Sequence, residues 1–165
     1  MDWPLPFRRL AVLGLGATGR ALISALAPLD LSLFLSEAKR LSADERAFLA
    51  SRGVAWEEDG HTDRVLETEL IVPSPGVPPH LPVLQAALRQ GIPVWSEIEL
   101  AFRLTRPRTL IAVTGTNGKS TVCQLLGAIL GATGLSPVVA GNIGRPAIST
   151  VGEVEGRPWV LEVSS

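Results

Sequence analysis

A glycine-rich stretch in the second half of the sequence carries the strongest chemical signal. Thr114-Gly-Thr-Asn-Gly-Lys-Ser-Thr follows an apolar run and precedes a helix-like run. Backbone N–H groups at a helix start point at anions, and glycines let the backbone approach a phosphate. The lysine can reach the outer phosphates, and the next hydroxyl can bind Mg²⁺. The stretch predicts an ATP-binding loop made of Gly115, Thr116, Asn117, Gly118, Lys119, Ser120 and Thr121.

This loop departs from the full phosphate-loop pattern at one position. Val113 stands where Gly-x-x-x-x-Gly-Lys-Ser has its first glycine, so only the shorter Gly-x-x-Gly-Lys-Ser remains. The alternative is a strand-to-helix turn whose lysine is merely exposed. Lysine is rare in this chain, however, with Lys39 and Lys119 the only two among 15 basic residues. The rarity of lysine and the flanking strand and helix favour the phosphate loop.

A second glycine loop, Gly14-Leu-Gly-Ala-Thr-Gly, follows the first apolar run with the spacing Gly-x-Gly-x-x-Gly. This spacing is typical of dinucleotide-binding folds, in which an acid after the next strand meets a ribose hydroxyl, and Glu37 has that position. The loop could equally hold any nucleotide diphosphate against the following helix, or be a tight turn without a ligand. The residues alone leave these possibilities open.

Composition and charge restrict the class of protein. The 165 residues are 46% hydrophobic with a net charge of -1 and no basic stripe, which speaks against a nucleic-acid or membrane partner. Apolar runs such as residues 10–15 are far shorter than the roughly 20 residues of a bilayer span. The first nine residues lack the order of a secretory signal, and the single Cys123 excludes an internal disulfide. We expect a cytoplasmic monomer.

Alternating strands and helices must position the two loops. Apolar runs that suit buried parallel strands span residues 10–15, 31–35, 69–72 and 92–95. Helix-like runs lie between them at residues 18–27, 42–53 and 82–90. Ser42 with Glu45 three residues later is a capping box, which marks the start of the second helix. This βαβαβα order predicts an α/β fold with a Rossmann-like parallel sheet as the N-terminal domain, residues 1–95.

A second domain is predicted after a short connection. Residues 96–108 are expected to form a helix capped by Ser96 and a linker. Residues 109–165 then read as the start of a P-loop ATP-binding α/β domain, with its first helix expected at residues 122–132. Strands are expected at residues 109–113, 136–140 and 159–165. Because a parallel sheet needs helices on both faces, we expect this domain to be incomplete.

Several motifs in this order and spacing resemble one enzyme family. They are the loop at residues 114–121, Ser74-Pro-Gly-Val, Gly141-Asn-Ile-Gly and Leu161-Glu-Val-Ser-Ser. Together they resemble the Mur ligases of peptidoglycan synthesis, most closely the members that join D-glutamate to UDP-N-acetylmuramoyl-L-alanine. The resemblance implies a first domain that holds the UDP of this substrate and a second that binds ATP and Mg²⁺.

The resemblance also implies roles for individual residues. Lys119 would be the catalytic residue that neutralises the ATP phosphates, and Ser120 with Glu162 would bind Mg²⁺. The UDP-muramoyl substrate would be bound by Gly16, Ala17, Thr18, Ser36, Ser74, Pro75, Gly76 and Asn142. One departure concerns the family's frequent Asp-Thr-Arg after the second strand. This chain has Ser36-Glu-Ala there, so Lys39 or Arg40 would have to replace the arginine.

The implied reaction uses ATP to turn the L-alanine carboxylate into an acyl phosphate, which the D-glutamate amine then attacks. In the family a histidine, a carbamylated lysine and a C-terminal domain complete this chemistry. They would lie beyond residue 165, so this stretch alone is expected to be inactive. The alternatives are an L-alanine-adding Mur ligase, an NAD-dependent oxidoreductase with a fused phosphate-loop domain, and a nucleotide-binding module without catalysis.

Other polar residues predict no chemistry of their own. His61 and His80 lack a second ligand at a metal-like spacing and are interpreted as surface residues. Cys123 is expected to be a small buried residue. The acidic run at residues 57–59 is interpreted as a solvated loop.

Overall fold

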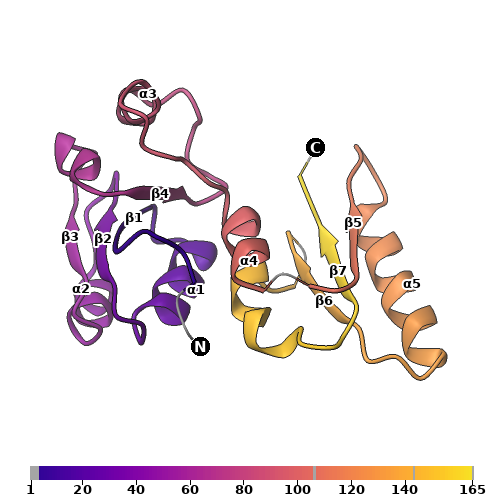
Figure 1. The fold of residues 1–165 in the computed structure, drawn as a ribbon. Helices are drawn as coiled ribbons and strands as arrows, with labels where there is room; N and C mark the ends of the chain where they lie inside the picture. Colours follow the sequence, from indigo (N-terminus) through magenta and orange to yellow (C-terminus); the bar gives the residue numbers. More distant parts are fainter. Residues whose placement is uncertain (1–3, 106, 143, 165) are drawn as a thin grey trace. The chain divides into compact units, whose positions relative to one another are not determined.

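The chain folds into two compact units, Met1–Glu97 and Ile98–Ser165. The computed structural model describes residues 4–105, 107–142 and 144–164. Each unit contains its own parallel sheet with helices (Figure 1). The predicted α/β class is therefore confirmed. No helix in the described part of the chain is long and apolar enough to cross a bilayer.

The first unit is built on a four-stranded parallel sheet. Its strands are β1 (Arg9–Leu13), β2 (Ser32–Ser36), β3 (Ala55–Glu57) and β4 (Leu70–Pro73). The strand order β3-β2-β1-β4 means that the chain moves outward from β1 and then returns to its other side. Sheets of this kind open a crevice beyond the carboxyl ends of the strands where the direction reverses, here between β1 and β4. The Rossmann-like arrangement is as predicted.

Helical segments connect these strands. They are α1 (Ala17–Leu26), α2 (Ala43–Ala50), the 3-10 helix η1 (Asp63–Glu67) and α3 (Pro82–Arg89). The predicted capping box of α2 is confirmed: the Ser42 hydroxyl accepts from the Glu45 N–H, and the Glu45 carboxylate accepts from the Ser42 N–H. It satisfies donors that would otherwise be unpaired at this helix start.

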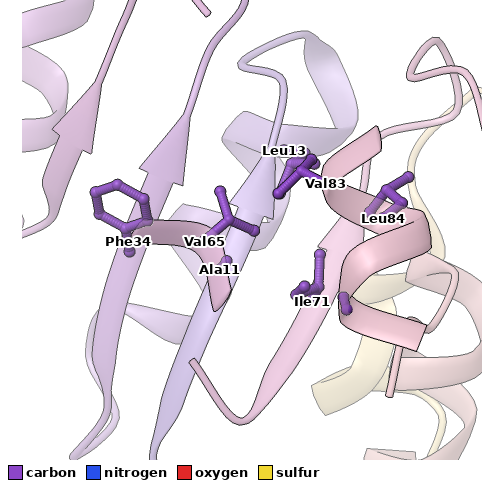
Figure 2. Packing of buried hydrophobic residues seen from close by; sticks show 8 residues of the cluster. Ala11, Leu13, Phe34, Val65, Ile71, Val83 and Leu84 are labelled. Atoms are coloured by element: carbon purple, nitrogen blue, oxygen red, sulfur yellow. The ribbon is translucent and has the colours of Figure 1, made fainter. Parts of the chain in front are cut away.

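The first sheet is buried on both faces, as a parallel sheet requires. Alternate residues of a strand face opposite sides, and Leu10 to Leu13 are all fully buried. Helices η1 and α3 contribute side chains to the cluster on one face (Figure 2). Its buried members are Ala11, Leu13, Phe34, Val65, Ile71, Val83, Leu84 and Ala87. This packing holds the carboxyl ends of β1 and β4 in place.

Two parts of the first unit differ from expectation. The three-residue strand β3 is not predicted by the sequence, because its apolar run, Val54 to Trp56, is only three residues long. Residues 92–95, predicted as a strand, form only an isolated parallel bridge between Val94 and Ile71. Ile71 donates its N–H to the Pro93 carbonyl, and Trp95 donates to the Ile71 carbonyl, both at 3.0 Å. Proline has no N–H to offer a further strand and therefore suits a sheet edge.

The second unit contains a three-stranded parallel sheet. Its elements are α4 (Glu97–Thr105), which starts at the boundary, β5 (Leu110–Val113), α5 (Lys119–Ala132), β6 (Val138–Gly141), the 3-10 helix η2 (Ala147–Glu153) and β7 (Trp159–Glu162). The order is β5-β7-β6, so the last strand is central. Glu162 at its end pairs with Val113 of β5 and Gly141 of β6. The carboxyl ends of all three strands thus meet.

Apolar side chains are less completely covered in the second unit. Val122, Leu125 and Ile129 of α5 are exposed, as is Leu110 of β5. Cys123 on the same helix is fully buried, as expected. Burial raises the pKa of the Cys123 thiol, and the nearby Glu162 carboxylate adds to the shift. A thiol of this kind is a poor nucleophile at neutral pH.

Candidate functional site

A cavity of about 610 Å³ lies at the carboxyl ends of β1, β2 and β4. Its volume is in the range of small-molecule sites. The lining residues come from the loops after these strands and from the segments that follow them. They are Gly14, Leu15, Gly16, Ala17, Thr18, Glu37, Ala38, Lys39, His61, Ser74, Pro75, Gly76, Val77, Pro78 and Leu81. The structure thus brings together six predicted substrate residues, namely Gly16, Ala17, Thr18, Ser74, Pro75 and Gly76.

The glycine loop after β1 is shaped by two close contacts. Gly14 has φ +84° and donates its N–H to the Ser36 carbonyl at 2.9 Å. A Cβ on Gly19 would lie 2.0 Å from the Gly14 carbonyl oxygen, so only glycine fits there. Ser74 ties the opposite wall to this loop, since its hydroxyl donates to the same oxygen at 2.9 Å. The two walls of the cavity are therefore connected by hydrogen bonds.

The start of α1 faces this cavity without a side-chain cap. Gly16 is the N-cap residue and supplies no capping side chain, and no acidic residue lies in the first turn. Gly16 and Ala17 are exposed, and Thr18 is partly buried. The unpaired N–H groups and the helix dipole favour an anion at this end.

Glu37 lies on the β2 side of the cavity and holds the glycine loop. One carboxylate oxygen accepts from the Leu15 N–H at 2.7 Å, and the other accepts from the Lys39 N–H at 3.1 Å. The acid that would meet a ribose hydroxyl in a dinucleotide site is thus engaged by the backbone through both oxygens. Lys39 lines the cavity, whereas Arg40 is not among the lining residues. Lys39 is therefore the better placed replacement for the family arginine.

Ser36 lies at the end of β2 and is fully buried, and it is not one of the lining residues. Its hydroxyl donates to Glu57 at 2.6 Å and lies 2.7 Å from Nδ1 of His61. Glu57 also accepts from the backbone N–H and hydroxyl of Thr62. Burial acts to raise the pKa of Glu57, but the hydrogen bonds from Ser36 and Thr62 outweigh it and the pKa is lowered. Glu57 is therefore ionised at neutral pH.

One interpretation proves wrong. The run at residues 57–59 is not simply a solvated loop, because Glu57 holds Ser36 and Thr62, and Glu58 pairs with Arg46 at 2.8 Å. His61, interpreted as a surface residue, is partly exposed and also lines the cavity. No local spacing marks His61, because its place depends on the pairing of β3 with β2.

The phosphate loop of the second unit connects β5 to α5. The helix starts at Lys119, three residues earlier than predicted, so Lys119, Ser120 and Thr121 form its first turn. Gly118 allows this early start because it adopts a left-handed conformation with φ +75°. No side chain caps the helix. The Lys119 Nζ donates to the Gly115 carbonyl at 2.6 Å, which folds its charge back over the loop.

Ser120 and Glu162 form a pair of oxygen donors beside this loop. The Ser120 hydroxyl donates to the Glu162 carboxylate at 2.6 Å, and Glu162 is only 6% exposed. A hydroxyl and a carboxylate suit Mg²⁺, which usually takes few protein ligands and keeps water or phosphate oxygens. Among the described residues no group of three or more His, Cys, Asp or Glu could hold a metal. This donor set therefore fits Mg²⁺ better than a protein-saturated metal such as structural zinc.

Asn142 follows β6 at the same edge of the second sheet. Its backbone N–H donates to the Glu162 carbonyl at 3.0 Å, and its side-chain amide donates to the Ser164 hydroxyl. The structure thus brings Asn142 close to the Ser120–Glu162 pair. Asn142 belongs to the second unit, whereas the other predicted substrate residues belong to the first unit.

Parallel sheets whose glycine loops open onto uncapped helices are typical of nucleotide-binding α/β proteins. Residues 9–83 match the family model of the MurD N-terminal domain. The chain is 40% identical over 163 residues to a UDP-N-acetylmuramoylalanine--D-glutamate ligase of Chlorobium phaeobacteroides. It is 41% identical over 154 residues to the protein of the same name from Mycolicibacterium vanbaalenii. The predicted resemblance to the Mur ligases is confirmed.

These relatives are longer than the chain. The alignments cover 96% and 87% of this chain but only 35% and 31% of the relatives, so the chain spans about a third of their length. Solved structures show the same fold at lower identity. A UDP-N-acetylmuramate:L-alanyl-gamma-D-glutamyl-meso-diaminopimelate ligase from Neisseria meningitides matches 94% of this chain and 52% of its own, with a TM-score of 0.53 and 19% identity. MurC from Thermotoga maritima matches 96% of this chain and 37% of its own, with a TM-score of 0.50 and 20% identity.

Proposed function

We propose that the chain is the nucleotide-binding part of an ATP-dependent ligase that adds D-glutamate to UDP-N-acetylmuramoyl-L-alanine. The observation that carries this proposal is the cavity at the carboxyl edge of the first sheet, in a stretch that matches the family model of the MurD N-terminal domain. The proposed reaction is the one named for the two bacterial relatives. Because the reaction consumes ATP, we propose the cytoplasm as its compartment.

The first cavity is the proposed site of the UDP part of the substrate. The diphosphate would lie against Gly16, Ala17 and Thr18 at the uncapped start of α1, where N–H groups favour an anion. Lys39 would supply the positive charge on the opposite side. The segment at residues 74–76 would complete the wall, held to the glycine loop by the Ser74 hydroxyl.

The loop at residues 115–121 is the proposed ATP site. Lys119 would leave the Gly115 carbonyl and turn to the outer phosphates, whose charge it offsets. Ser120 and Glu162 would hold Mg²⁺, which supplies additional positive charge beside the phosphates when bound. Asn142, which neighbours this pair, would contact the muramoyl part of the substrate.

The proposed reaction makes and breaks two bonds in turn. The alanine carboxylate oxygen attacks the γ-phosphorus of ATP, the bond to ADP breaks, and an acyl phosphate forms. The D-glutamate amine then attacks the acyl carbon, loses a proton, and inorganic phosphate leaves with formation of the amide. Lys119 stabilises the negative charge that develops on the transferred phosphoryl group. The rival oxidoreductase is disfavoured, because the relatives at 40% and 41% identity are named as ligases.

Calorimetric titration of the chain tests the first site. We expect UDP-N-acetylmuramoyl-L-alanine to bind and NADH not to bind. Thr18→Arg should lower the affinity for the UDP ligand, because a bulky side chain would enter the cavity that Thr18 lines. Ser24→Arg is the matched control, since Ser24 is exposed on the same helix outside this cavity. Binding of NADH without a response to the UDP ligand would overturn the proposal.

A further inference from the structure

His61 stands in the cavity wall with one ring nitrogen already fixed. Nδ1 lies 2.7 Å from the Ser36 hydroxyl oxygen, and Ser36 is fully buried. The structure gives His61 no other hydrogen bond within the described residues, and no buried side-chain nitrogen or oxygen among them lacks a partner. Nε2 is therefore accessible, and the ring lines the cavity of about 610 Å³.

The hydrogen bonds of Ser36 decide which ring nitrogen carries the proton. A hydroxyl has one hydrogen, and Ser36 donates it to Glu57 at 2.6 Å. Glu57 accepts from Thr62 as well, and its pKa is lowered, so it is an ionised carboxylate that only accepts. The Ser36 oxygen must then accept from His61, which places the proton on Nδ1. In the neutral ring Nε2 consequently carries a lone pair.

An accessible acceptor of fixed orientation can read the edge of a nucleobase. Uracil offers an N–H donor at N3 between two carbonyl oxygens, whereas cytosine has a lone pair at N3. A lone pair on Nε2 accepts from the first and repels the second. His61 and the proposed anion site line the same cavity but belong to different strands, because the partner of His61, Ser36, ends β2 and the uncapped helix follows β1.

We propose that His61 selects uracil over cytosine by accepting a hydrogen bond from N3–H of the base at Nε2, with Ser36 and Glu57 fixing its tautomer. This inference rests on the proposed binding of a UDP-linked substrate in the same cavity. It adds a specificity residue on the β2 side to the phosphate contacts on the α1 side.

The test compares UDP with CDP, because the two ligands share their diphosphate and ribose. His61→Asn retains an amide N–H that can replace Nδ1–H at Ser36 but removes Nε2. We expect it to lower the affinity for UDP roughly three- to tenfold, the value of one hydrogen bond, and not to lower the affinity for CDP, because the repulsion between Nε2 and N3 of cytosine is removed as well. His80→Asn is the matched control, since His80 is exposed and outside the lining.

Nitrogen NMR of the unsubstituted protein supplies a readout that needs no variant. We expect the His61 imidazole to be protonated at Nδ1 in the free protein, and the Nε2 signal to shift when UDP is added. An Nε2–H tautomer, or an unchanged ratio of UDP to CDP affinity in His61→Asn, would overturn this inference while UDP binding itself still stood. Failure of the unsubstituted protein to bind UDP would overturn the proposed function together with it.

Discussion

Lys119 is the residue whose charge the proposed reaction needs most. Within the described part of the chain its Nζ donates to a carbonyl of its own loop, which a phosphate oxygen could replace. Lys119→Ala should lower the affinity for Mg·ATP roughly 10- to 100-fold, the value of a charge-assisted hydrogen bond, and leave UDP binding unchanged. Lys39→Ala is the matched control, and it should lower the affinity for the UDP ligand and leave the affinity for Mg·ATP unchanged. Equal effects of the two variants on both ligands, measured by calorimetry, would contradict the assignment.

Glu57 should make stability depend on pH. Its pKa is lowered from the ordinary value of 4.5 in the folded chain. Its stabilisation is therefore fully present above about pH 4.5 and is lost as the pH falls through the folded pKa. Glu57→Gln should lower the free energy of unfolding at pH 7, and the decrease should be smaller at pH 3. Urea denaturation at the two pH values measures both decreases. The exposed Glu155→Gln is the control, and a loss for Glu57→Gln that is equal at both pH values would disprove the explanation.

At the scale of elements, the turn from β1 into α1 depends on the absence of a side chain at Gly19. A Cβ there would lie 2.0 Å from a backbone oxygen that is held by β1 and Ser74. Gly19→Ala should therefore cost at least about 1–3 kcal/mol, as overpacking does. Gly16→Ala places the same methyl group where nothing lies within 4 Å and should cost less. Denaturation midpoints measure both, and equal losses would contradict the argument.

Elements with a local signal were predictable from the sequence. The capping box at Ser42 and Glu45 satisfies its own helix start, so four residues suffice to recognise it. The turn from β5 into α5 was also recognisable, but the start of α5 was misplaced because Gly118 adopts a left-handed conformation that spacing does not reveal. An apolar run alone does not establish a strand. Residues 92–95 were predicted as a strand from such a run, but they form a single bridge, between Val94 and Ile71.

The cavity wall was only partly predictable. Residues of the two glycine-containing loops follow strands directly, so their meeting at one sheet edge could be expected. Ser36, Glu57 and His61 come together only because β3 pairs with β2, and β3 has no sequence signal of its own. The sequence therefore predicted the part of the cavity wall formed by the glycine loop better than the part near the end of β2, which we assign to the base.

On the scale of the whole molecule, each of the two units carries one of the two proposed nucleotide sites. The strands that bear each site end at a single sheet edge, and the backbone of each loop is held within its own unit. Each nucleotide should therefore protect the amides of the loop that it contacts, because binding stabilises the state that it contacts. The assignment of UDP to the first unit and ATP to the second is the central claim.

Amide hydrogen exchange tests this claim most directly. The chain would be measured alone, with UDP-N-acetylmuramoyl-L-alanine, and with Mg·ATP. We predict that the UDP ligand slows exchange at residues 14–18, 37–39 and 74–76, and that Mg·ATP slows exchange at residues 115–121. Protection of residues 14–18 by Mg·ATP, or a UDP ligand that leaves all three segments of the first unit unchanged, would contradict the account.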